Sequence, residues 1–264
     1  MDIRISDAAS GKNLHIDFAS GISVSCAFFP PEGEVALVDI LPEIFSLSNE
    51  LIAHALAAAA AEGSRASCEK GCVSCCYQLI VMSDHEALLL AHIVSLMEPK
   101  ERARVKAALR SMLQILERHG LLAEMLDSHA NCFTDSKRLV EVQKKYWELQ
   151  LACPFLVDGA CSVYAFRPLV CRQYMVSSPR ECCAQIFKPG NMMKKIPLAY
   201  DLGSALASFN GAAAKPTLAV PIPAVLLVNG LLESFPRPKA SAEAMMAAFL
   251  AHLEENFTRS AARP

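Results

Sequence analysis

The sequence predicts a mostly α-helical protein of the α+β class, with a small β element at its N-terminus and an irregular cysteine-rich module packed among the helices. Three observations lead to this prediction. Apolar and polar residues alternate within the first 28 residues, and apolar residues recur at helical spacing over most of the remaining chain. Cysteines gather in two stretches that carry little helical signal.

The N-terminal region is expected to form short strands. The segments 3–8, 13–18 and 22–28 alternate in polarity, and Gly11 and Gly21 stand where turns would separate them. A pair of prolines follows the third segment and ends the strand pattern.

Helical signals dominate the rest of the chain. Ser83 and Glu86 have the spacing of a capping box, which predicts a helix start. Pro99 suits the first turn of another helix, and Gly120 follows the expected end of that helix. The expected helices cover about 47–61, 83–97, 99–118, 135–151, 197–209, 222–233 and 241–257.

We expect three regions along the chain. Residues 1–66 hold the N-terminal β element and a helix, and residues 67–190 hold the cysteine module with a helical insert at 98–150. Residues 191–264 form a C-terminal helical segment. No repeat or low-complexity linker separates these regions, so the C-terminal segment is expected to pack on the same core.

Composition limits the classes of function. Hydrophobic residues make up 53% of the chain and the mean hydropathy is +0.29, a composition that either membrane spans or buried apolar helices would explain. The apolar stretch 51–61 is shorter than the roughly 20 residues of a span, and prolines break the stretch 216–232, so we expect buried helices and no membrane partner. A net charge of −2 without a dense basic run argues against nucleic-acid binding. The first residues lack a signal-peptide pattern, which favours a cytoplasmic location.

Eleven cysteines are the most informative feature of the sequence. In a reducing compartment, clustered cysteines bind metal or take part in redox chemistry more often than they form disulfides. The first cluster places four thiols within nine residues, at Cys68, Cys72, Cys75 and Cys76. The second cluster consists of Cys153, Cys161 and Cys171. Thiolates bind zinc and iron–sulfur clusters, so the two segments predict a metal-binding module packed among the helices.

The sequence leaves the number of metal centres open. Neighbouring side chains point opposite ways in an extended chain, so Cys75 and Cys76 either serve different partners or sit on a sharply bent turn. The Asp-Gly pair between Cys153 and Cys161 favours a tight hairpin. A regular hairpin would place these two cysteines on opposite faces or far apart along the strands. Either each segment serves more than one centre or the segment is irregular. Two further thiols that could complete a second centre are Cys182 and Cys183.

These motifs resemble the YkgJ-type cysteine-cluster family. Its pattern opens with closely spaced cysteines that end in a Cys-Cys pair and continues with a helix that begins at Ser/Thr-x-x-Glu. It closes with Cys-Pro-Phe-Leu, a glycine turn, Cys-Ser-Ile/Val-Tyr and Arg-Pro-x-x-Cys-Arg. The matching positions, within about 67–185, are Cys68, Cys72, Cys75, Cys76, Ser83, Glu86, Cys153, Pro154, Phe155, Leu156, Gly159, Cys161, Ser162, Val163, Tyr164, Arg167, Pro168, Cys171 and Arg172.

The chain also departs from the family pattern. It carries the long insert at 98–150, and it has two adjacent cysteines where members often have one, so either Cys182 or Cys183 is the equivalent residue.

The family is described as a zinc- or iron-chelating domain, so the resemblance implies a metal centre and no particular activity. The thiols are in surplus and no paired histidine ligands accompany them, so we expect iron, as a [4Fe–4S] cluster or as iron alone, in preference to zinc. A structural zinc protein is one alternative. A more distant similarity to flagellin lysine N-methylase, an enzyme thought to carry an Fe–S centre, leaves a protein-modifying enzyme open, with a protein substrate or redox partner. The lack of an S-adenosylmethionine loop counts against a methylase.

Other residues near the clusters allow further predictions. Arg167 and Arg172 flank Cys171, and we expect at least one of them to answer the negative charge of metal-bound thiolates by hydrogen-bonding a sulfur or a carbonyl beside the site. Cys26 and Cys132 stand alone in the sequence, and each is expected to be a buried or incidental thiol and not a ligand. His85 is expected to be a solvated residue at a helix start.

Overall fold

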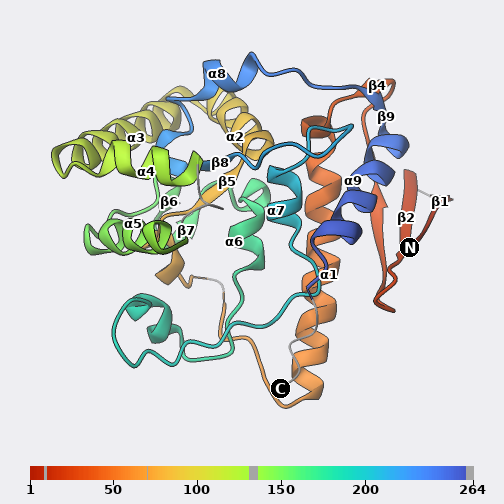
Figure 1. The fold of residues 1–264 in the computed structure, drawn as a ribbon, viewed down its shortest axis with the longest axis horizontal. Helices are drawn as coiled ribbons and strands as arrows, with labels where there is room; N and C mark the ends of the chain where they lie inside the picture. The colour runs from red at the N-terminus through yellow and green to blue at the C-terminus, as the bar shows by residue number, and fades with distance from the viewer. Residues whose placement is uncertain (9–10, 70, 131–135, 260–264) are drawn as a thin grey trace.

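The computed structural model describes residues 1–8, 11–69, 71–130 and 136–259 (Figure 1). It has the predicted α+β class, with helices in the majority and a small antiparallel sheet at the N-terminus. Cys132 lies outside the described residues.

The N-terminal sheet and two long helices form one end of the molecule, and three other helices form the opposite end (Figure 1). The first group is α1 (Leu41–Ala61) and α9 (Ala242–Asn256). The second is α3 (Pro99–Arg118), α4 (Leu121–Ala130) and α5 (Ser136–Glu148). Two short helices lie between them, α6 (Leu169–Gln173) and α7 (Leu202–Ala207).

The three predicted N-terminal strands are confirmed. They are β1 (Asp2–Ala8), β2 (Gly11–Asp17) and β3 (Ser23–Phe28), which pair antiparallel in chain order. Leu14 pairs with Cys26 and Ile16 with Val24, and all four side chains are buried. Cys26 is therefore a buried thiol of this sheet, which is one of the two alternatives expected for it. Gly11 has a φ of 128°, and a Cβ there would lie 2.1 Å from the ring of Phe29, so only glycine fits.

Helix α1 begins earlier than the expected residue 47. It starts at Leu41, directly after the 3-10 helix η1 (Leu37–Ile40), because Pro42 is tolerated in the first turn and opens the helix. The helical stretch from Leu37 to Ala61 is long and apolar enough, by length and composition, to cross a membrane. The N-terminal half of α1 packs in the largest core through Ile44, Leu47 and Leu51, which accounts for its apolar composition.

The capping box at Ser83 is confirmed. Ser83 follows strand β5 (Val81–Ser83) and caps α2 (Asp84–Leu96), with Glu86 N donating to Ser83 Oγ at 3.1 Å. The helix expected from residue 99 is α3, and the helix expected from residue 135 is described from Ser136 as α5. Residue 135, the expected first residue of this helix, lies outside the described residues.

The C-terminal segment contains less helix than expected. The helices expected at 197–209 and 222–233 are reduced to α7 and to α8 (Asn229–Glu233). Pro221 and Pro223 favour instead the end of strand β8 (Ala219–Pro221) and a 3-10 turn, η5 (Ile222–Ala224). Strand β8 pairs with β5, and β9 (Ala240–Ser241) pairs with β4 (Glu34–Val35), so the C-terminal segment is hydrogen-bonded to both earlier regions.

Apolar clusters hold these elements together. The first joins the N-terminal sheet and α1 to α7 and α9. The second joins α2 and α3 to residues 220–232 and includes Phe155 and Val163 of the second cysteine segment. Cys153 and Cys161 pack against this second core. The cysteine module is therefore fixed by neighbouring helices and does not stand apart from them.

Candidate metal centre

The first cysteine segment folds as a series of tight turns. Gly71 takes a φ of 89°, which a residue with a side chain rarely adopts. Cys75 and Cys76 lie on the 3-10 helix η2 (Ser74–Tyr77), and Cys76 N donates to the Val73 carbonyl at 2.8 Å. The adjacent pair therefore sits on a sharply bent turn, one of the two arrangements that the sequence left open.

The second cysteine segment combines a hairpin with an irregular turn. Strands β6 (Leu156–Val157) and β7 (Ala160–Cys161) are joined by Asp158 and Gly159, both with positive φ. Cys153 precedes the hairpin in a turn closed by a 3.0 Å hydrogen bond from Leu156 N to the Cys153 carbonyl. This irregularity leaves the Cys153 and Cys161 thiols close enough to interact electrostatically.

Cys171 lies in the middle of α6, and two hydrogen bonds fix the start of that helix. Cys171 N donates to the Pro168 carbonyl at 2.9 Å. Leu169 N donates to the carboxylate of Glu86 at 2.6 Å, which ties α6 to the start of α2. Glu86, the second member of the capping box of α2, therefore also positions a predicted metal ligand.

Hydrogen bonds join the two cysteine segments directly. Cys153 N donates to the Cys76 carbonyl at 2.8 Å. The thiol of Cys68 donates to the Tyr174 carbonyl at 3.8 Å, just beyond α6. The remaining predicted thiols, Cys182 and Cys183, lie on the 3-10 helix η4 (Arg180–Gln185), and Gln78 Nε2 approaches the Cys183 carbonyl at 3.5 Å.

The nine predicted cysteines form two groups that overlap at Cys75. Electrostatic interactions connect the first group, which is Cys75, Cys76, Cys153, Cys161 and Cys171. They also connect the second group, which is Cys68, Cys72, Cys75, Cys182 and Cys183. Thiols that are widely separated in the sequence are therefore brought into one region.

Burial determines the protonation of most of these thiols. It raises the pKa of Cys153 to about 12 and the pKa of Cys171 well above its usual value, and neighbouring thiols add to both effects. Cys75 differs, because a hydrogen bond with the adjacent Cys76 thiol lowers the pKa of Cys75 and raises the pKa of Cys76. The lowered pKa favours the thiolate form at Cys75, where the two groups overlap.

Arg167 is the cation that faces the thiols. Its positive charge acts to lower the pKa of Cys75, Cys161 and Cys171. Burial has the larger effect on Cys161 and Cys171, so the pKa of each of these two thiols is still raised. Its Nε is buried and makes no hydrogen bond to any residue that the structure describes. The guanidinium lies 4.0 Å from the centre of the Tyr164 ring. A buried guanidinium nitrogen without an acceptor is costly, so this position favours a negative group nearby.

Arg172 instead braces the loop that precedes Cys171. It is 4% exposed, and its Nε donates to the Arg167 carbonyl at 2.9 Å. Its other nitrogens donate to the Ala165 carbonyl and, at 3.2 Å, to Asn49 Oδ1 on α1. The guanidinium also lies 4.3 Å from the centre of the Phe45 ring. Arg172 therefore links the cysteine module to α1.

Sequence reasoning missed one residue beside this region, Arg104, and mispredicted the burial of another, His85. Arg104 of α3 donates to the Pro154 carbonyl at 3.0 Å and places a positive charge near Cys153. Only the fold brings this residue of the insert to the second cysteine segment. The expectation that His85 is solvated is wrong, since it is 2% exposed and its Nε2 lies 2.8 Å from the Phe209 carbonyl. The C-terminal segment covers this helix start.

The thiols are gathered in one region but do not converge on a point. Within the ranges that the structure describes, no three side chains of His, Cys, Asp or Glu are arranged to hold one ion. The donor chemistry nevertheless fits a thiophilic metal, and the unsatisfied Arg167 Nε fits the negative charge of metal-bound thiolates. A cysteine needs only a rotation about χ1 to redirect its sulfur.

Comparison with models of protein families, with curated proteins and with solved structures returns no match for this sequence. The resemblance to the cysteine-cluster family therefore stays a prediction that depends on the motif residues alone.

Proposed function

We propose that the clustered cysteines bind iron as a [4Fe–4S] cluster, because the resemblance to the YkgJ-type family implies a metal centre and the surplus of thiols without paired histidines favours iron. The observation that carries this proposal is the meeting of thiols from both segments. Cys76 and Cys153 are joined through their backbones, and the thiols of Cys75 and Cys171 interact with each other and with Cys153. Four thiolates are the usual ligand set of such a cluster.

This proposal favours four ligands, which are Cys75, Cys76, Cys153 and Cys171. Cys161 belongs to the same group of thiols and is the fifth candidate. A bound cluster would supply one-electron redox chemistry. The chain itself buries the sulfurs, joins the two segments and offers the Arg167 guanidinium to the negative charge of the ligands. Because the thiols bind metal as thiolates, binding releases protons and should strengthen as pH rises.

The overlap at Cys75 favours a second candidate arrangement with two centres. The other group offers Cys68, Cys72, Cys182 and Cys183, and the thiol of Cys183 interacts with the remaining three. Under this arrangement Cys75 belongs to the first centre. Cys68→Ser would then remove part of the metal, whereas in the single-centre arrangement it would leave the metal content unchanged.

Zinc is the alternative metal, and its role would then be structural. A protein-modifying activity is an alternative that would require a protein substrate, and electron transfer would require a redox partner. We place the protein in the cytoplasm, where reducing conditions keep thiols free, with neither a membrane nor a nucleic acid as partner.

The experiment is metal and acid-labile sulfide analysis of protein purified without oxygen, together with its visible absorption spectrum. We expect iron and sulfide in equal amounts and a broad absorption that bleaches on reduction. Stoichiometric zinc with neither iron nor sulfide would overturn the iron proposal, because zinc has no visible transition and needs no sulfide.

A further inference from the structure

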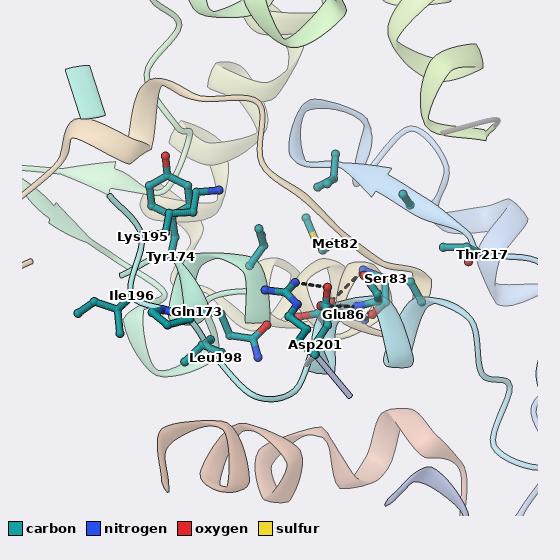
Figure 2. Close-up of a pocket in the computed structure, with 18 residues that line it drawn as sticks. Met82, Ser83, Glu86, Gln173, Tyr174, Lys195, Ile196, Leu198, Asp201 and Thr217 are labelled. Atoms are coloured by element: carbon teal, nitrogen blue, oxygen red, sulfur yellow. Dashed lines mark hydrogen bonds and ion pairs between the residues drawn. The ribbon is translucent and has the colours of Figure 1, made fainter. Parts of the chain in front are cut away.

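A cavity of about 340 Å³ lies beside the cysteine module (Figure 2). Its walls come from β5, α6, α7, β8 and the segment 195–198, and Arg259 also lines it. Val170 and Gln173 line it from α6, the helix that also carries Cys171. The volume is within the range of small-molecule sites in proteins.

The lining of the cavity is divided between apolar walls and charged groups. The apolar side chains include Val81, Met82, Val170, Ile196, Leu198 and Ala219. Lys195 and Tyr174 lie together, with Lys195 Nζ 4.7 Å from the centre of the Tyr174 ring (Figure 2). Lys195 is solvent-exposed in part, which places it at the mouth of the cavity.

The other charged groups of the lining already have partners. Glu86 accepts hydrogen bonds from Ser83 and from Leu169 N. Asp201 accepts from Arg259 and, at 3.1 Å, from Ser204 N. Lys195, by contrast, forms no ion pair with any carboxylate in the described part of the chain.

The charge at the mouth favours an anion. The Lys195 ammonium and the Arg259 guanidinium are close enough to repel each other, and only Arg259 has a carboxylate partner. A negative group placed there would pair with Lys195 and relieve this repulsion. The walls behind it would exclude water from an apolar group.

We propose that this cavity binds a small organic anion whose apolar body contacts the inner walls and whose carboxylate pairs with Lys195. This site is additional to the metal centre, and its Lys195 ammonium also interacts with the thiol of Cys183. Its place beside α6 would bring such a ligand next to the helix that carries Cys171.

The test measures binding of benzoate and of its uncharged analogue benzamide to the full-length protein by titration calorimetry. We expect saturable binding of benzoate, tighter than that of benzamide by about tenfold or more, since a charge-assisted hydrogen bond supplies this ratio. Lys195→Met should abolish the preference and Lys195→Arg should keep it. Lys194→Met is the matched control, because its side chain is exposed and does not line the cavity, and it should also keep the preference.

Three results would overturn the proposal. They are equal affinity of the wild-type protein for the two compounds, no saturable binding of benzoate, and a preference that survives in Lys195→Met. Loss of the preference in Lys194→Met to the same extent would also contradict it, because it would indicate a general effect of surface charge. The wild-type protein and its variants are compared at equal metal content, because Lys195 also interacts with the Cys183 thiol, so the proposal can fail while the metal centre stands.

Discussion

The buried carboxylate of Glu86 fastens the helix that carries Cys171, so replacing it with alanine should destabilise the protein. Its oxygens accept hydrogen bonds from Ser83 N and Ser83 Oγ, both at 2.8 Å, and from Leu169 N at 2.6 Å. Glu86 is 3% exposed. In Glu86→Ala, two backbone N–H groups and one hydroxyl would lose their acceptor inside the protein.

The magnitude follows from the two backbone donors. Each buried donor left without an acceptor costs about 1–3 kcal/mol, which gives about 2–6 kcal/mol for both. Two effects reduce this cost. The variant no longer buries a carboxylate, and water can reach the freed N–H groups because Glu86 lines the neighbouring cavity. We expect the free energy of unfolding to fall by about 2–4 kcal/mol.

The assay is urea unfolding followed by circular dichroism at neutral pH. Glu141→Ala is the matched control, because Glu141 is an exposed glutamate of α5 and its replacement should change the free energy of unfolding by no more than about 0.5 kcal/mol. The reasoning would be refuted if Glu86→Ala lost no more stability than Glu141→Ala.

Glu86 should also give the protein a distinctive pH dependence. Burial raises the pKa of Glu86, so above its ordinary value of 4.5 the folded state keeps a proton that the unfolded state has released. Its contribution to stability is therefore largest at low pH and falls as pH rises through the folded pKa. Glu86→Gln cannot titrate, so the stability of the wild type relative to this variant should decline over that window. A rise over the same window would contradict the expectation.

The other predictions concern the metal centre. Cys171→Ser should lower both metal content and Tm, because metal-binding energy at such a site is folding energy, whereas Cys26→Ser should leave the metal content unchanged. Full metal content and an unchanged Tm in Cys171→Ser would show that the two cysteine segments act independently. Arg167→Ala should weaken metal retention against a graded chelator by about 10–100-fold. Arg172→Ala should mainly lower the Tm, since Arg172 braces the loop, and wild-type retention in both arginine variants would show that neither tunes the centre.

Local signals in the sequence were sufficient for the fold class. The alternation of apolar and polar residues predicts the N-terminal strands, and the spacing of Ser83 and Glu86 predicts the capping box. Both patterns depend only on residues that are close in the chain. The start of α1 and the lengths of α7 and α8 were less predictable. These boundaries depend on prolines and on packing against distant segments, which local periodicity does not report.

The candidate site was predictable as a set of residues but not as an arrangement. The sequence identifies the nine clustered cysteines. Their spacing alone does not show that Cys153 lies against Cys76, or that the thiols form two groups that share Cys75. The burial of His85 and the hydrogen bond from Arg104 to the Pro154 carbonyl arise from contacts between regions far apart in the chain. Such contacts leave no periodic signal.

Helix α6 connects the stability of the fold with the chemistry of the candidate centre. A helix of five residues has too few internal hydrogen bonds to be stable alone, so its neighbours must hold it. Glu86 holds its start, and Arg172 braces the loop before it against α1. Cys171 lies between these two supports, so a metal bound there would act as a third support for the same helix. Loss of any support would therefore loosen a metal ligand, and loss of the metal would in turn loosen the contact between α2 and α6.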